Sequence, residues 1–164
     1  MTDQRGIPLD QVVEYADAYT GRPAVVSAIR QRLGNLEPSE ALRSLAKLPW
    51  RAVYSVNFDD LFEIACQAER PGKLRVFSAP ENLEEIRPGE IPLYMLHGSI
   101  RAANSTPGLV ITREDMERSL AGRQAFYRRL TGDMQSGELV YVGFSLSDSD
   151  FRRVVADEPS GARA

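Results

Sequence analysis

The spacing of the apolar residues along this chain changes near residue 50. Before that point they recur every three or four positions, which is typical of helices that bury one face. Helices are predicted from Leu9 to Ala18, from Pro23 to Leu33 and from Ser39 to Leu48, with glycine or proline at each break. Ser39 is a suitable N-cap for the third, because its hydroxyl can accept a hydrogen bond from a free backbone N–H.

After residue 50, short apolar runs alternate with helical patterns. Strands are predicted at Ala52–Val56, Leu74–Phe77, Pro92–Leu96, Leu109–Ile111 and Leu139–Val142. Helices are predicted at Asp59–Ala68, from a Thr112/Asp115 capping box to about Leu120, at Gln124–Met134, and from Ser147 to Val155. This alternation indicates βαβ units, and therefore an α/β fold with a Rossmann-like, mostly parallel sheet and helices on both faces.

The chain length of 164 residues is typical of one domain. We expect a single domain over residues 1–156, made of an N-terminal helical segment (9–49) and a strand-helix core (50–156). The tail, residues 157–164, consists mostly of small and polar residues, and this composition is typical of disorder.

Small or polar residues follow three of the predicted strands. Asn57 and Asp59 follow the first, His97 follows the third, and Gly143 and Ser145 follow the last. Ligands of open α/β sheets bind outside the carboxyl ends of the strands. Taken together, the three strand ends predict a nucleotide pocket.

Each of these residues alone also has a structural explanation. Asn57 is suited to a turn, and Asp59 to the first turn of a helix, where negative charge is favoured. His97, the only histidine, is suited to a satisfied structural position as well as to proton transfer near neutral pH. The functional interpretation therefore depends on their occurrence together at successive strand ends.

Composition narrows the choice of partners. The net charge is −3 and no basic cluster is present, so we expect no nucleic-acid partner. Cys66 is the only cysteine, which excludes an internal disulfide and a cysteine zinc cluster, and we expect no metal. No apolar run approaches ~20 residues and no signal peptide is visible, which predicts no membrane association and a cytoplasmic location.

The segments SVNFD, LHGS and GFSLSD, in that order, resemble the sirtuin-like (silent-information-regulator-like) domain, and most closely its bacterial branch. The resemblance covers roughly Val12 to Val155. It implies binding and hydrolysis of NAD to nicotinamide and ADP-ribose, by an NAD glycohydrolase of antiphage defence. It is also compatible with an activator or partner protein and with a homo-oligomer.

The resemblance also implies roles for individual residues. Asn57 matches the asparagine that positions the nicotinamide ribose and a water, and Asp59 matches the acid that contacts the nicotinamide carboxamide. His97 matches the catalytic base. Gly143 and Ser145 match a loop that contacts the adenosine side of NAD.

The sequence departs from the family in two ways. The glycine-rich loop that cradles the pyrophosphate is missing, and the segment most similar to it is Gly6-Ile7-Pro8. The missing loop predicts weak or no activity for this polypeptide. The paired CxxC modules of deacylase sirtuins are also missing, which disfavours an NAD-dependent protein deacylase. The main alternative to an NAD hydrolase is a truncated or degenerate nucleotide-binding or regulatory module without catalysis.

Overall fold

The computed structural model describes residues 9–79, 83, 86–102 and 108–143, and the statements below concern these ranges. The helices are α1 (Leu9–Thr20), α2 (Arg22–Leu33), α3 (Glu40–Ala46), α4 (Leu61–Glu69), α5 (Arg113–Gly122) and α6 (Gln124–Ser136), with a short 3-10 helix, η2 (Ile100–Ala102). The strands are β1 (Val53–Ser55), β2 (Leu74–Phe77) and β3 (Ile91–Met95). The predicted α/β class is confirmed, and the predicted bounds of β2 agree with the structure. No helix in these ranges is long and apolar enough to cross a membrane.

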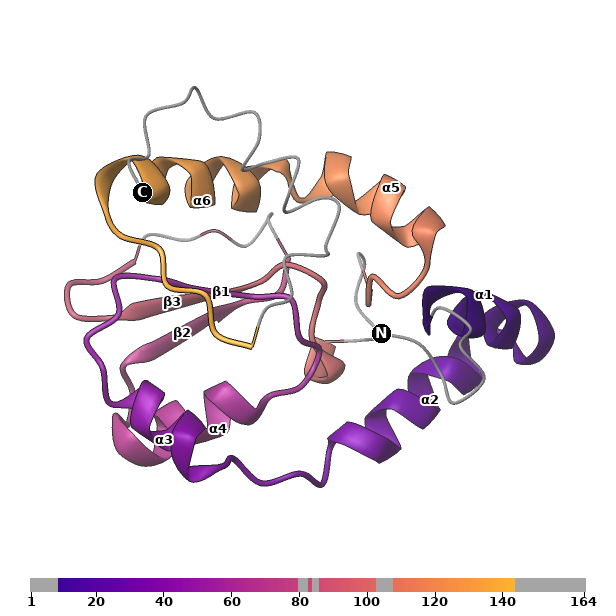
Figure 1. Cartoon of the computed structure of the whole chain (residues 1–164), viewed down its shortest axis with the longest axis horizontal. Helices are drawn as coiled ribbons and strands as arrows, with labels where there is room; N and C mark the ends of the chain where they lie inside the picture. The colour runs from indigo at the N-terminus through magenta and orange to yellow at the C-terminus, as the bar shows by residue number, and fades with distance from the viewer. Residues whose placement is uncertain (1–8, 80–82, 84–85, 103–107, 144–164) are drawn as a thin grey trace.

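The three strands form a parallel sheet in the order β1-β3-β2 (Figure 1). Every residue of the central strand β3 is buried. A central parallel strand is covered by helices on both faces, which explains why its sequence, IPLYM, lacks the polar alternation of a half-exposed strand. β1 was predicted to be buried but is only half-buried, since β3 is its one strand partner in the described sheet.

Each face of the sheet has its own core. On one face, Tyr94 of β3 stacks between Tyr54 and Phe77, with ring centroids 4.9 and 5.3 Å apart, and Phe126 of α6 packs against it. On the other face, the apolar residues belong mainly to α3 and α4: Leu42, Ala46, Phe62, Ala65 and Cys66, packed with Leu74 of β2. The sheet is therefore covered by α6 on one side and by α3 and α4 on the other (Figure 1).

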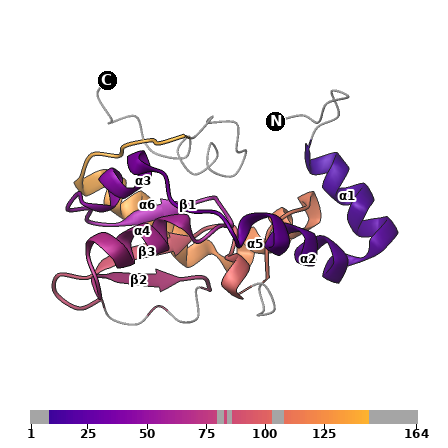
Figure 2. The same cartoon turned by 90° about the horizontal axis from the view of Figure 1, so that it is seen from below.

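The helices α1 and α2 form a hairpin at one end of the molecule, beside α5 (Figures 1 and 2). Polar contacts fasten this hairpin. Arg22 of α2 forms a bidentate pair with Asp115 of α5 at 2.7 and 2.8 Å, and Nε of Arg30 donates to the carbonyl of Ile100 at 2.9 Å. The helical segment is thereby attached to the chain that follows β3.

The predicted strand at Leu139–Val142 is wrong. Residues 138–141 follow α6 without regular structure or pairing to the described sheet, and Val140, Tyr141 and Val142 are 61%, 44% and 57% exposed. Apolar, β-branched composition favours a strand, but a strand also needs a neighbouring backbone to hydrogen-bond with. Composition alone therefore predicted a strand that the structure does not have.

The predicted strand at Leu109–Ile111 is also wrong, because these residues are not in strand conformation and do not pair with the described sheet. Leu109 and Val110 are buried, and the N–H of Val110 donates to the carbonyl of His97 at 2.9 Å. The predicted helix from Ser147 to Val155 and the tail at 157–164 lie outside the described residues.

Candidate functional site

The carboxyl ends of β1 and β3 lie side by side because the two strands are parallel. Ser55 is in register with Met95, and the N–H of Leu96 donates to the carbonyl of Ser55 at 2.8 Å. Further along, the N–H of Ile100 donates to the carbonyl of Phe58 at 2.9 Å. The segments that leave the two strands are thus joined at two points.

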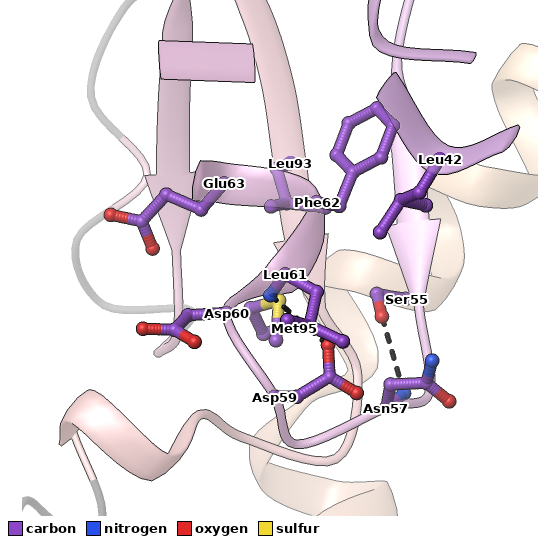
Figure 3. Close-up of a pocket in the computed structure, with 10 residues that line it drawn as sticks. All are labelled: Leu42, Ser55, Asn57, Asp59, Asp60, Leu61, Phe62, Glu63, Leu93 and Met95. Carbon is purple, nitrogen blue, oxygen red and sulfur yellow. Dashed lines mark hydrogen bonds between the residues drawn. The ribbon is translucent and has the colours of Figure 1, made fainter. Parts of the chain in front are cut away.

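The segment after β1 is ordered by its own side chains (Figure 3). The hydroxyl of Ser55 accepts a hydrogen bond from the N–H of Asn57 at 3.2 Å, and a carboxylate oxygen of Asp59 accepts one from the N–H of Leu61 at 3.1 Å. Asp59 thereby satisfies a backbone donor at the start of α4, as a carboxylate near a helix N-terminus is suited to do. The carboxamide of Asn57 is exposed and takes part in neither bond.

Asn57 and Asp59 line the same cavity, between β1 and the start of α4 (Figure 3). Its other lining residues are Leu42, Ser55, Asp60, Leu61, Phe62, Glu63, Leu93 and Met95. The cavity has a volume of about 90 Å³, below the roughly 300–1,000 Å³ of sites that enclose a whole small ligand. It can accept a ring-sized fragment or a few waters rather than an entire dinucleotide.

An ion-pair network joins two of the lining residues, Asp60 and Glu63, to Arg101. Nε of Arg101, on η2, donates to Asp60 at 2.6 Å, and its Nη1 lies 3.5 Å from Glu63. The hydrogen bond to Asp60, followed by the nearby charge of Glu63, raises the pKa of Arg101 despite partial burial. Because the Arg101 side chain is 55% exposed, we expect this network to contribute little to stability.

His97 lies two residues after β3 and is 8% exposed. Its ring centroid is 6.4 Å from that of Phe58, the residue between Asn57 and Asp59. His97 is not among the residues that line the cavity. The structure therefore places Asn57 and Asp59 in the wall of one cavity. His97 lies near Phe58 of the same turn but does not line that cavity.

The third predicted strand end is not part of this arrangement. Gly143 has a φ of 63° and is exposed, with no atom within 4 Å of the position that a Cβ would take, and it does not line the cavity. Ser145 lies outside the described residues. Among the described residues, no three His, Cys, Asp or Glu side chains are grouped so that they could hold a metal ion.

The roles of several residues of this region were not predicted from the sequence. Ser55 was visible in the SVNFD segment, but only its bond to Asn57 shows how it orders the turn. Arg101 falls in a segment of loop composition, and Arg123 falls between two helices. Nothing in the local pattern distinguishes Arg123, which is fully buried against the backbone around His97.

Comparison with known proteins gives a consistent result. The family model described as SIR2-like domain matches residues 51–158. The NAD(+) hydrolase ThsA of Enterococcus faecium is 32% identical over 124 residues, which are 74% of this chain and 25% of that protein. The NAD(+) hydrolase ThsA of Acinetobacter baumannii is 27% identical over 145 residues, 87% of this chain and 29% of that protein. A third, from Bacillus cereus, is 21% identical over 122 residues, 72% of this chain and 24% of that protein.

The chain spans about a quarter of the length of these curated relatives. The family match covers well over half of the chain, and it includes β1, β3 and all of the residues that line the cavity except Leu42. The chain belongs to the SIR2-like domain family.

Proposed function

We propose that this SIR2-like domain cleaves the N-glycosidic bond of NAD, releasing nicotinamide and ADP-ribose, in bacterial defence against phage. The observation that carries the proposal is the cavity beyond β1, where Asn57 and Asp59 meet beside the turn of His97. The names of the relatives, NAD(+) hydrolases, support this substrate and this reaction.

The reaction needs groups that hold the nicotinamide as it leaves, groups that hold the ribose and the attacking water, and a base. The bond from the ribose C1′ to the nicotinamide nitrogen breaks, and the positively charged ring leaves as a neutral molecule with the bonding electrons. A water adds its oxygen to C1′, and a base takes the proton that this water loses. Charge builds up on the sugar as the ring departs, so groups that hold the ribose and the water accelerate the step.

The described residues provide candidates for each contribution. Asn57 has an exposed amide that can both donate and accept, which suits the ribose and the attacking water. Asp59, on the same cavity wall, would accept from the nicotinamide carboxamide. His97 would take the proton. Gly143, together with Ser145 outside the described residues, would contact the adenosine side of NAD.

A cavity of about 90 Å³ fits the nicotinamide end of NAD better than the entire molecule. His97 does not line this cavity, and this observation favours a second candidate function, a nucleotide-binding or regulatory module without catalysis. In that case the protein would bind NAD and release no nicotinamide. An activator, a partner protein and a homo-oligomer are compatible with either function.

Nicotinamide release from NAD, followed by chromatography, tests the proposal. Asn57→Ala should lower the rate at least tenfold with little change in the unfolding midpoint, because the side chain is exposed and its carboxamide takes no part in the bonds that order the turn. Asn35→Ala, at an exposed position in the turn after α2, is the matched control and should keep the rate. Equal rates for both variants would contradict the assignment of Asn57.

A further inference from the structure

Arg123 stands between α5 and α6 in the sequence, and its charged side chain is fully buried. Burying a charged guanidinium costs a large desolvation free energy unless hydrogen bonds replace its hydration. Its Nη1 donates to the carbonyl oxygens of Met95 at 2.8 Å and Ser78 at 3.2 Å, and its Nη2 donates to the carbonyl of Gly108 at 3.1 Å. One side chain therefore holds backbone at three places that are distant in sequence.

Two of these carbonyls belong to the surroundings of His97. The carbonyl of Met95 also accepts the N–H of Gly98 at 3.1 Å, which closes a four-residue turn with His97 as its third residue. Gly98 has a φ of 85°, a conformation that other residues rarely adopt. Arg123 thus donates to the same oxygen that closes the turn.

The second carbonyl fixes the segment that lies against this turn. Gly108 is two residues before Val110, whose N–H donates to the carbonyl of His97 at 2.9 Å. A Cβ at Gly98 would lie 2.8 Å from the Gly108 oxygen and 3.4 Å from Nη2 of Arg123. The turn, the 108–110 segment and the guanidinium are therefore in close contact, which leaves the backbone of His97 little freedom.

We propose that Arg123 is a positioning residue that fixes the His97 turn through the carbonyls of Met95 and Gly108. Its importance for catalysis rests on the proposed function, in which His97 is the base. Arginine is suited to this role because its planar fork donates in several fixed directions. A lysine ammonium is a single point of charge and cannot reproduce the divergent bonds from two nitrogens.

The test uses the imidazole of His97, which is the only histidine of the chain. Histidine-selective NMR of protein purified without a polyhistidine tag reports that ring alone, with or without enzymatic activity. The variants are Arg123→Lys and Arg123→Met. Leu130→Ala, at a fully buried position about two turns further along α6, is the matched control for lost core packing.

We expect one sharp imidazole signal in the native protein and in Leu130→Ala. In Arg123→Lys and Arg123→Met, the signal should shift and split or broaden while the circular dichroism stays native. Unchanged imidazole signals in the folded variants would overturn the proposal. Loss of folding in both variants would also overturn it, because Arg123 would then support the whole fold rather than the turn.

A kinetic measurement separates this inference from the proposed function. If the protein cleaves NAD, Arg123→Lys should lower kcat at least tenfold and change KM less than about twofold, because the turn orients the base rather than the bound substrate. The two proposals can also fail separately. If the Arg123 variants lose the native imidazole signal but the native protein cleaves no NAD, the positioning role is supported and the hydrolase is contradicted. A kcat equal to that of the native protein in Arg123→Lys would contradict positioning.

Discussion

The carboxylate of Asp115 connects the N-terminal hairpin to α5, and its removal should have a measurable, pH-dependent effect on stability. It accepts two hydrogen bonds from Arg22 at 2.7 and 2.8 Å and two from the N–H groups of Ile111 and Thr112 at 3.0 and 2.9 Å. The N–H of Asp115 donates in return to the hydroxyl of Thr112 at 3.1 Å. The predicted Thr112/Asp115 capping box is thus confirmed, with an arginine added to it.

The expected loss in the free energy of unfolding follows from these contacts. Loss of a capping interaction costs about 1 kcal/mol. The pair with Arg22 should add about 1 kcal/mol and no more, since the Arg22 side chain is 37% exposed and water screens it. Asp115→Ala should therefore lower the free energy of unfolding by about 2 kcal/mol, or the Tm by roughly 4–8 °C for a chain of this size.

The pH dependence has a definite sign. Burial alone raises the pKa of Asp115, but the hydrogen bonds from Arg22, Ile111 and Thr112 outweigh it and lower the pKa below its ordinary value. The stabilisation is complete above the unfolded pKa of about 3.9 and is lost as the pH falls through the folded pKa. The difference in Tm between native protein and Asp115→Ala should be constant from about pH 7 to pH 5 and should shrink below about pH 4.

Thermal unfolding followed by circular dichroism at several pH values measures both quantities. Glu117→Ala removes an exposed carboxylate from the same helix and is the control, with an expected change within about 0.5 kcal/mol. A loss below about 0.5 kcal/mol for Asp115→Ala, or a difference that does not change down to pH 3, would refute the reasoning.

Three further predictions concern the sheet and its surroundings. Gly98→Ala should destabilise the fold by at least about 1–3 kcal/mol in urea unfolding, because φ is 85° and a Cβ would lie 2.8 Å from the carbonyl oxygen of Gly108; a smaller loss would show that the turn relaxes. Burial raises the pKa of the Cys66 thiol to about 11, so its reaction with a disulfide reagent at pH 8 should be slow and should accelerate greatly in denaturant; equal rates would contradict its burial. Tyr54→Phe should cost about 1 kcal/mol in urea unfolding, since it removes the 2.6 Å hydrogen bond to Asp133, and an unchanged midpoint would show that this bond contributes nothing.

The sequence was most informative where local pattern decides the structure. The bounds of β2 and the capping box at Thr112 follow from composition and spacing alone, and the structure has both. The apolar run at Leu139–Val142 misled, because composition reports suitability for a strand but not the presence of a backbone to pair with. Long-range pairing is not encoded in a window of a few residues.

The same distinction applies to the candidate site. Asn57 and Asp59 were expected to contribute to a nucleotide pocket with two other strand ends, and the structure shows that these two residues line one cavity. The burial of His97 outside that cavity, and the hydrogen bonds from Arg123 to the carbonyls of Met95 and Gly108, depend on segments that only the folded chain brings together. The single-domain prediction over residues 1–156 and the catalytic assignments stay predictions.

Nicotinamide release from NAD by the native protein and by His97→Ala is the most direct test of the proposed hydrolase. The account predicts slow release by the native protein and none by His97→Ala, whose circular dichroism should remain native. Release at the native rate by His97→Ala would remove His97 from the mechanism. Binding of NAD without release by the native protein would contradict the hydrolase and favour the non-catalytic module.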